Sequence, residues 1–104
     1  MTDPKHATPA TRAANHEVLE RLPFADRQDF DDADRGFIAP LPEGGVVDDG
    51  NGNVVWDLSR FAFLEAGDDP PDTVNPSLWR QSQLVVKGGL YQVVDRLYQV
   101  RSAD

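Results

Sequence analysis

The chain reads NPSLWRQSQLVVKGGLYQVVDRLYQVR over residues 75–101. Asn75-Pro76 is typical of a helix N-cap with proline in the first turn, and Gly88-Gly89 is typical of a helix end. These signals predict a helix over residues 76–87. Its buried face is expected to consist of four apolar side chains: Leu78, Trp79, Leu84 and Val85.

Two apolar runs follow the glycines and are joined by Asp95-Arg96. They predict a β-hairpin over residues 90–101. Strand edges in native proteins are usually paired or protected, because an open edge invites aggregation. We therefore expect this sheet to continue in a further part of a longer protein.

The first half of the chain predicts two helices. Thr8-Pro9 marks the start of a helix over residues 9–21. Its apolar stripe is narrow, which indicates a helix that lies on a larger body. Asp26 is expected to cap a short helix over residues 27–35, which Gly36 closes in the left-handed conformation.

A second hairpin is the strongest local prediction in the first half. Val46-Val47 and Val54-Val55-Trp56 flank a turn rich in Asp, Asn and Gly, so a β-hairpin is expected over residues 46–56. Three smaller predictions are an extended apolar stretch over residues 37–41, a single turn capped by Asp57 that contains Phe61 and Leu64, and a surface loop over residues 65–72. The predicted fold class is α+β.

Composition restricts the classes of protein that this chain can represent. The 104 residues suffice for one small domain, and a hydrophobic content of 39% is slightly low for a self-sufficient one. The net charge of −8 argues against nucleic acid and membranes as partners, since clustered Lys and Arg bind both. Without cysteine, disulfides, thiolate zinc sites and cysteine catalysis are excluded. The sequence shows no signal peptide and no membrane-spanning run, so we expect a soluble protein, cytoplasmic by default, whose compartment the sequence leaves undetermined.

The acidic segments do not match a calcium site. Five aspartates lie between Asp26 and Asp34, and residues 49–53 resemble the first half of a calcium loop. In both segments the glycine required at the sixth position and the glutamate required at the twelfth are missing. We interpret the first segment as a solvated helix face and the second as a hairpin turn.

No catalytic constellation is recognisable. His6 and His16 are the only histidines, whereas a zinc site built within the chain would need three or four protein ligands. Gly88-Gly89 lacks the later glycine of a dinucleotide-binding motif. Four serines were weighed as nucleophiles and have no suitable context: Ser59, Ser77, Ser82 and Ser102. We therefore predict no catalytic, cofactor-binding or metal-binding residue in this chain.

The large amphipathic side chains are interpreted as residues at the edge of a core, with their polar atoms hydrogen-bonded. The alternative is that some of them line a contact with another domain or subunit. These side chains are Trp56, Trp79, Tyr91 and Tyr98.

Three blocks of the sequence form a more specific pattern. The most specific block is DTVNPSLWRQ at residues 72–81, followed by GLYQVV at 89–94 and LYQVR at 97–101. The others are AAN at 13–15 with LPFAD at 22–26, and RGFIA at 35–39 with GNVVWD at 52–57. In order and spacing, residues 9–101 resemble the N-terminal region of the alkylsulfatases of the metallo-β-lactamase superfamily. Small departures are Arg96 in place of Gly or Asn, Lys87 in place of His, and Ser102-Ala103 in place of a Gly-aromatic pair.

The resemblance implies that the chain is the N-terminal segment of a zinc-dependent hydrolase, which converts an alkyl sulfate and water to an alcohol and sulfate. In that family a metallo-β-lactamase domain is accompanied by a helical dimerisation domain and a domain similar to sterol carrier proteins. Two zinc ions are held by a His-x-His-x-Asp-His motif and by further His and carboxylate residues, none of which matches a position of this sequence. We expect the parent enzyme to hold two zinc ions, and this chain alone to be inactive and to bind none.

The expected organisation has three parts. Residues 1–8 form a mobile tail, residues 9–74 an arm of helices and a hairpin that wraps a larger body, and residues 75–104 the helix and first strand pair of a catalytic αββα domain that is incomplete in this chain. The expected partners are the remainder of that domain and a second copy of the parent in a homodimer. The alternative hypothesis is a small acidic non-enzymatic module that binds a protein by strand addition at Leu97–Arg101.

Overall fold

The computed structural model describes residues 3–65 and 69–103 of the chain. The helices in these ranges are α1 (Pro9–Arg21), α2 (Gln28–Asp34) and α3 (Pro76–Val85), with two short 3-10 segments, η1 (Pro42–Gly45) and η2 (Ser59–Leu64). The strands are β1 (Phe37–Ala39), β2 (Val46–Asp48), β3 (Val54–Asp57), β4 (Gly89–Val94) and β5 (Leu97–Arg101). The α+β class is confirmed. The surface loop predicted at residues 65–72 includes 66–68, which lie outside the described residues, as do residues 1–2 of the predicted tail.

The two proline-led helices begin where the sequence predicts. The Thr8 hydroxyl accepts a hydrogen bond from the Thr11 backbone N–H at 3.2 Å, and the Asn75 side-chain oxygen accepts one from the Ser77 N–H at 2.8 Å. In each case the cap satisfies a backbone donor that has no partner inside the helix. None of the helices in the described residues is long and apolar enough to cross a membrane.

Two helix ends differ from the prediction. The N-cap of α2 is Arg27, because the Asp26 carboxylate accepts from the Gln28 N–H at 3.0 Å and forms a turn one residue ahead of the helix. Helix α3 ends at Val85 and not at residue 87, since the Val86 N–H already bonds the Ser82 and Leu84 carbonyls as the last turn tightens. Gly36 closes α2 with a φ of +80°, as predicted.

The cap of α3 can be tested by a single substitution. Asn75→Ala removes the acceptor for the Ser77 N–H, so we expect the protein to be destabilised by about 1 kcal/mol. Thermal melts measure the change. Ser77→Ala is the matched control, because it keeps the backbone donor and should leave the midpoint within about 0.5 kcal/mol of the wild type. An unchanged midpoint for Asn75→Ala would remove Asn75 from the cap role.

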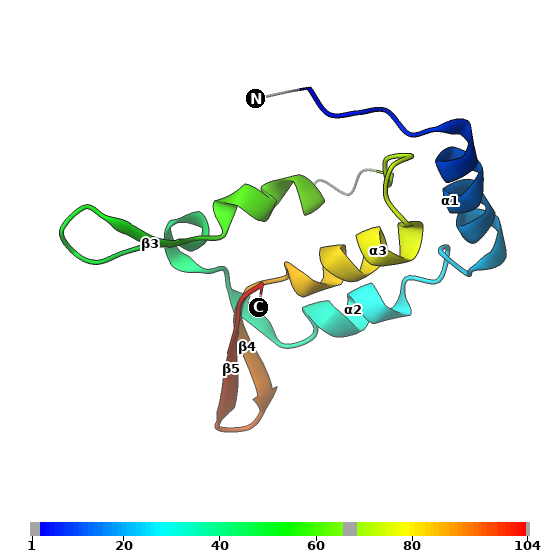
Figure 1. The fold of residues 1–104 in the computed structure, drawn as a ribbon. Coiled ribbons are helices and arrows are strands. Elements are labelled where there is room, and N and C mark those ends of the chain that lie inside the picture. Colours follow the sequence, from blue (N-terminus) through cyan, green and yellow to red (C-terminus); the bar gives the residue numbers. More distant parts are fainter. Residues whose placement is uncertain (1–2, 66–68, 104) are drawn as a thin grey trace.

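The strands form two antiparallel sheets (Figure 1). The β2–β3 hairpin and the β4–β5 hairpin are both confirmed, and Arg96 turns the second of them with a φ of +68°. The extended stretch predicted at residues 37–41 contains β1, which pairs with β4 and makes a sheet of order β1-β4-β5. Gly36 permits this pairing, because a Cβ on it would lie 2.2 Å from the Gln92 carbonyl oxygen.

The core of the described residues is very small. Its buried apolar side chains are Phe30, Leu64 and Tyr91, of which Tyr91 is only 2% exposed. Trp79 and Leu84 are half-buried, but Leu78 and Val85 are exposed, so the prediction that they belong to the buried face of α3 is wrong. Few side chains of the other elements lie against that side of the helix in this chain.

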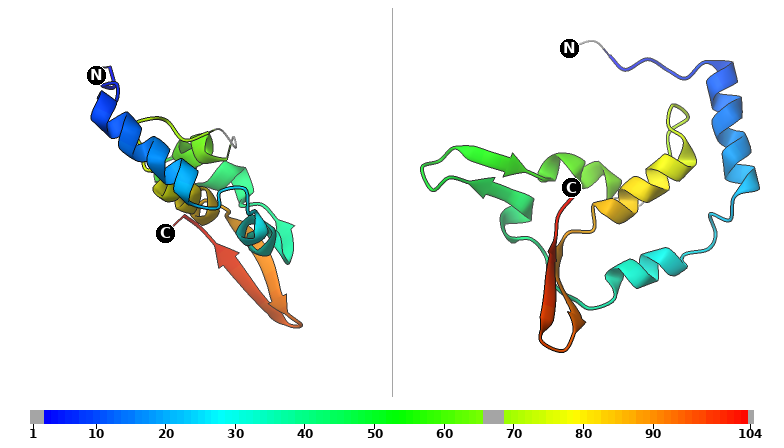
Figure 2. Two further views of the ribbon diagram at one scale, coloured as in Figure 1. Left: turned by 90° about the vertical axis from the view of Figure 1, so that its right-hand side faces the viewer. Right: turned by 60° about the horizontal axis from the view of Figure 1, so that its bottom comes forward.

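The molecule is flat and open (Figure 2). It measures 48 × 39 × 17 Å, and its radius of gyration is 17.0 Å, whereas a compact domain of this length has about 13 Å. Its accessible surface of 8071 Å² exceeds the roughly 5,800 Å² expected for a compact monomer of 11.5 kDa. The division of the chain at residues 8 and 74 stays a prediction, although β1 joins its two larger parts through β4.

Candidate functional site

The described residues hold no group of three or more His, Cys, Asp or Glu side chains that could bind a metal ion. His6 is exposed ahead of α1, and His16 lies on α1 with its Nε2 at 3.0 Å from the Asp72 carboxylate. The zinc ions implied by the family resemblance therefore do not fit the described part of this chain. Its candidate sites are contacts and surfaces instead.

The serines lie at turns and helix ends. The Ser59 hydroxyl and N–H donate to the Asp57 carboxylate at the start of η2, which confirms the cap predicted for that turn. Ser77 contributes its backbone N–H to the Asn75 cap, and the Ser82 carbonyl accepts from Val86. Ser102 follows β5. None of the four is placed beside a histidine by the contacts of the described residues.

Two aspartates of α2 hold α3. The Asp29 carboxylate accepts from Arg80 at 2.9 Å, and the Asp34 carboxylate accepts from Lys87 at 2.8 Å. The interpretation of this segment as a purely solvated face is wrong for these two residues, although both remain largely exposed. Such exposed pairs contribute little each, so their main effect is to set the orientation of the two helices.

The second acidic segment is a hairpin turn, as predicted. The Asp49 carboxylate accepts from the Asn53 side chain at 2.9 Å and from the backbone N–H groups of Asn51 and Asn53. The Asn53 side chain, helped by these backbone donors, holds the pKa of Asp49 below its ordinary value. The carboxylate oxygens are thus used inside the turn.

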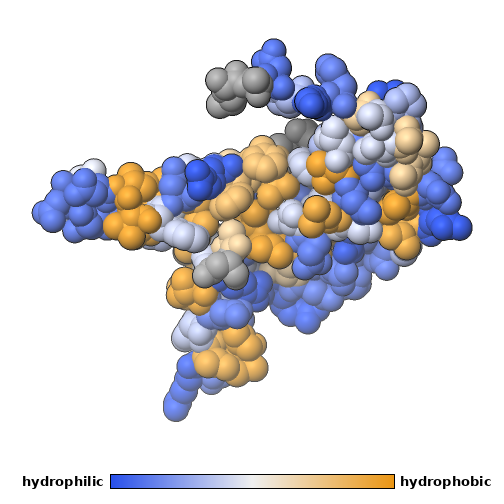
Figure 3. Space-filling view, viewed as in Figure 1, coloured by the Kyte–Doolittle hydropathy of each residue, from blue (hydrophilic) through white to orange (hydrophobic). Residues whose placement is uncertain are grey.

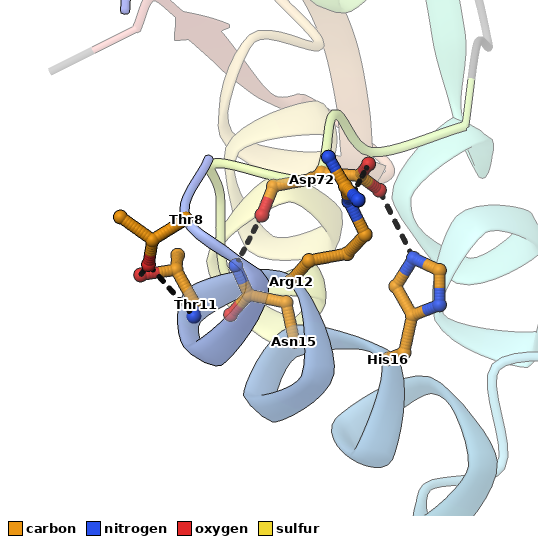
Figure 4. A network of polar contacts seen from close by, with 6 residues as sticks. All are labelled: Thr8, Thr11, Arg12, Asn15, His16 and Asp72. Carbon is orange, nitrogen blue, oxygen red and sulfur yellow. Dashed lines mark hydrogen bonds and ion pairs between the residues drawn. The ribbon is translucent and has the colours of Figure 1, made fainter. Parts of the chain in front are cut away.

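A polar clasp fastens α1 to the loop before α3 (Figure 4). Asp72 accepts from Arg12 Nε at 2.9 Å, its carboxylate lies 3.0 Å from His16 Nε2, and its backbone carbonyl accepts from Asn15 at 2.7 Å. No side chain of α1 is buried, so its placement depends on this clasp more than on apolar packing. The hydrogen bonds from His16 and then Arg12 hold the pKa of Asp72 below its ordinary value.

Removal of the clasp is expected to loosen α1. Asp72→Asn keeps the shape but loses the charge, so trypsin should cleave after Arg12 and Arg21 faster than in the wild type. Because the pKa of Asp72 is lowered by folding, its contribution is present above pH 3.8 and is lost as the pH falls through the lower folded-state pKa. Asp29→Asn, which breaks a pair between α2 and α3, is the control. Equal cleavage of both variants would contradict the clasp.

The centre of the molecule is an aromatic cluster surrounded by cations. The Phe30 ring has Arg27 Cζ at 3.7 Å, Arg80 Cζ at 5.3 Å and Lys87 Nζ at 5.9 Å from its centroid. The Tyr91 ring carries Arg101 at 3.7 Å, and its hydroxyl donates to the Lys87 carbonyl at 3.1 Å. These cation–π contacts join α2, α3, β4 and β5, and are each worth about 0.5–2 kcal/mol.

Two projecting hairpins expose apolar side chains (Figure 3). On β4–β5 the exposed side chains are Val93, Val94, Leu97, Tyr98 and Val100, and on β2–β3 they are Val47, Val54, Val55 and Trp56. Tyr91 is buried with its hydroxyl hydrogen-bonded, as predicted. The prediction of core packing is wrong for Trp56 and Tyr98, which are 50% and 55% exposed.

The sequence analysis missed two of these features. Asp72 and Phe30 were not singled out, because their partners lie about fifty or more residues away in the chain. Phe30 stands among aspartates on a short helix, and this amphipathic placement was the one local signal for a buried aromatic ring.

Comparison with known proteins gives a consistent result. The chain is 52% identical over 100 residues to the linear primary-alkylsulfatase of a Pseudomonas species and 46% identical over 100 residues to the alkyl/aryl-sulfatase BDS1 of Saccharomyces cerevisiae, which in each case covers 96% of this chain and 15% of the relative. The solved structure of the stereoselective inverting sec-alkylsulfatase Pisa1 from Pseudomonas sp. superimposes with a TM-score of 0.82 at 51% identity, over 95% of this chain and 15% of that one. No protein-family model matches the chain.

The chain thus spans about 15% of the length of the relatives that it matches. An identity near one half over nearly all its residues, together with the same backbone arrangement, leaves no other origin than common descent. The chain is therefore a homologue of the alkylsulfatases over a segment that amounts to 15% of their length.

Proposed function

We propose that this chain is the N-terminal segment of a zinc-dependent alkylsulfatase of metallo-β-lactamase type, and that its own role is structural. The observation that carries the proposal is the identity of about half of the residues over 96% of the chain with enzymes named as alkylsulfatases. The parent would hydrolyse alkyl sulfate esters as a homodimer.

The open shape of the chain supports a structural role. A compact monomer of this size would expose roughly 2,300 Å² less surface, which is nearly three times the ~800 Å² that one partner buries in an interface of ordinary size. The apolar side chains of both hairpins belong to this extra surface. A segment with so large an unburied apolar surface is suited to lie against the rest of a larger protein, where burial of that surface stabilises the whole.

The position of the β4–β5 hairpin supports the same role. Strand β5 has one neighbour, β4, and apolar side chains such as Tyr98 and Val100 are exposed on it. Strands with apolar side chains on both faces are typical of sheets covered on both sides. In the proposed parent this hairpin provides the first strands of the catalytic domain, and the zinc ligands come from residues outside those described.

The proposal is tested with the full-length gene product and with this chain alone. Sulfate release from dodecyl sulfate is measured with added zinc and with a chelator as the control. We expect chelator-sensitive turnover by the full-length protein and none by the 104-residue chain. Turnover by the chain alone would contradict its structural role, and a zinc-loaded full-length protein without sulfatase activity would contradict the proposed enzyme.

One observation favours a second candidate function. The outer edge of β5 has no neighbouring strand among the described residues, which is the arrangement that strand addition by a partner protein requires. The chain would then be an acidic interaction module. A His-x-His-x-Asp-His motif in the codons that follow residue 104 would favour the enzyme, and its absence would favour the module.

A further inference from the structure

An uncharged groove lies at the base of the β2–β3 hairpin. It has a volume of about 340 Å³, and its lining includes Leu41, Pro42, Val47, Trp56, Leu58 and Ser102. Val47 and Trp56 stand opposite each other in the hairpin register, so their side chains share one face of it. They are 51% and 50% exposed, which leaves a large apolar area of this groove in water.

The chain itself passes into this groove as it leaves the sheet. Strand β5 ends at Arg101, Ser102 forms part of the groove wall, and Ala103 lines an adjoining hollow together with Leu41 and Leu58. Figure 1 accordingly places the C-terminal end between the base of β2–β3 and the end of α3. Whatever follows residue 104 in a longer polypeptide begins its path beside Val47 and Trp56.

We infer that the segment directly after Asp104 lies in this groove and packs uncharged, apolar side chains on Val47 and Trp56. The inference rests on the proposed function, which makes this chain part of a longer polypeptide. An extended segment advances about 3.3 Å per residue, so five or six residues reach across the hairpin base. Covalent attachment keeps this segment at a high effective concentration at the groove, unlike any separate partner. A second copy of the chain would also bring a surface of net charge −8 to a groove whose lining residues carry no charge.

A photo-crosslinker placed in the groove tests the inference. Benzoylphenylalanine is introduced at Trp56 of the full-length protein, and cross-links are mapped by peptide fragmentation. We expect a cross-link within the same chain to one of the first ten or so residues beyond Asp104. The matched control is benzoylphenylalanine at Val55, which is 64% exposed on the opposite face of β3, does not line the groove and should not reach that segment. A cross-link from Trp56 to another region, to an isotope-labelled second copy, or to nothing overturns the inference.

A second measurement avoids a bulky replacement. The 104 residues contain no cysteine, so Val47→Cys introduces a thiol whose alkylation can be followed by peptide mass spectrometry. We expect its labelling in the native full-length protein to be slowed at least tenfold relative to Asn51→Cys in the exposed hairpin turn. Equal labelling rates for the two variants would show that the groove is open and would overturn the inference.

Failure of this inference can be told apart from failure of the proposed function. The same crosslinked and alkylated proteins are assayed for sulfate release before modification. A protein that hydrolyses dodecyl sulfate but whose Trp56 cross-links elsewhere retains the function and refutes the groove occupant. A protein with the expected cross-link and no sulfatase activity refutes the enzyme alone.

Discussion

Replacement of Tyr91 by alanine is expected to destabilise the region around the β4–β5 hairpin by about 3–5 kcal/mol, the usual loss for a buried aromatic ring. Tyr91 is 2% exposed, and its ring contacts Phe37 edge to face at 5.5 Å and the Arg101 guanidinium at 3.7 Å. Arg101 in turn donates to the Ala33 carbonyl of α2 at 2.9 Å. The alanine variant therefore removes the side chain through which the sheet and α2 meet.

Hydrogen exchange of residues 89–101 in the full-length protein measures this loss, because it reports the free energy of local opening and not that of the whole protein. Tyr91→Phe is the matched control. It keeps the ring and loses only the hydrogen bond to the Lys87 carbonyl, so it should cost about 1 kcal/mol. If both variants open with the same free energy, the ring is not the centre of the cluster.

The parts of the fold that the sequence predicts are those set by neighbouring residues. Thr8 and Asn75 cap helices whose first turn holds a proline, and Gly36 supplies the left-handed residue that ends α2. The Asp-Gly-Asn-Gly turn forms the first hairpin through hydrogen bonds that span at most four residues. Such local signals depend on backbone geometry alone, and so they hold whatever the rest of the molecule does.

The parts that the sequence does not predict depend on partners far along the chain. The pairing of β1 with β4 brings residue 37 beside residue 91, and the clasp brings Arg12 to Asp72. No periodicity marks these partners, since an exposed aspartate in a Pro-rich loop has the same local pattern whether or not it binds a helix. Contacts of this kind can be read only from the folded backbone.

The wrong predictions of burial share a physical cause. Leu78, Val85, Trp56 and Tyr98 were expected to pack in or beside a core, yet all four are exposed in this chain. The pattern correctly identifies them as apolar positions of regular elements, but the pattern cannot tell which body covers them. Their exposure agrees with a segment whose apolar surfaces are meant for residues other than its own, as the proposed function requires.

The chain in isolation is expected to lack a cooperative unfolding transition. Its buried apolar side chains in the described residues are Phe30, Leu64 and Tyr91, and α1 buries none. Against this small core stands an ordering cost of about 1–2 kcal/mol per residue for the backbone. The isolated 104 residues should therefore be partly unfolded or should self-associate through the open β5 edge and the exposed hairpins.

Calorimetry together with sedimentation measures this directly. The expected result is a broad or absent transition, or a sedimentation coefficient that rises with concentration, whereas the same residues within the full-length protein should be protected from hydrogen exchange. A matched variant, Val100→Lys, places a charge on the exposed face of β5 and should reduce any self-association of the isolated chain. A monomer that melts sharply above about 60 °C, at the upper end of the range for mesophilic domains, would show that the chain closes its own core. That result would favour the independent interaction module over the structural segment of a larger hydrolase, because a segment that needs no further body has no reason to expose both hairpins.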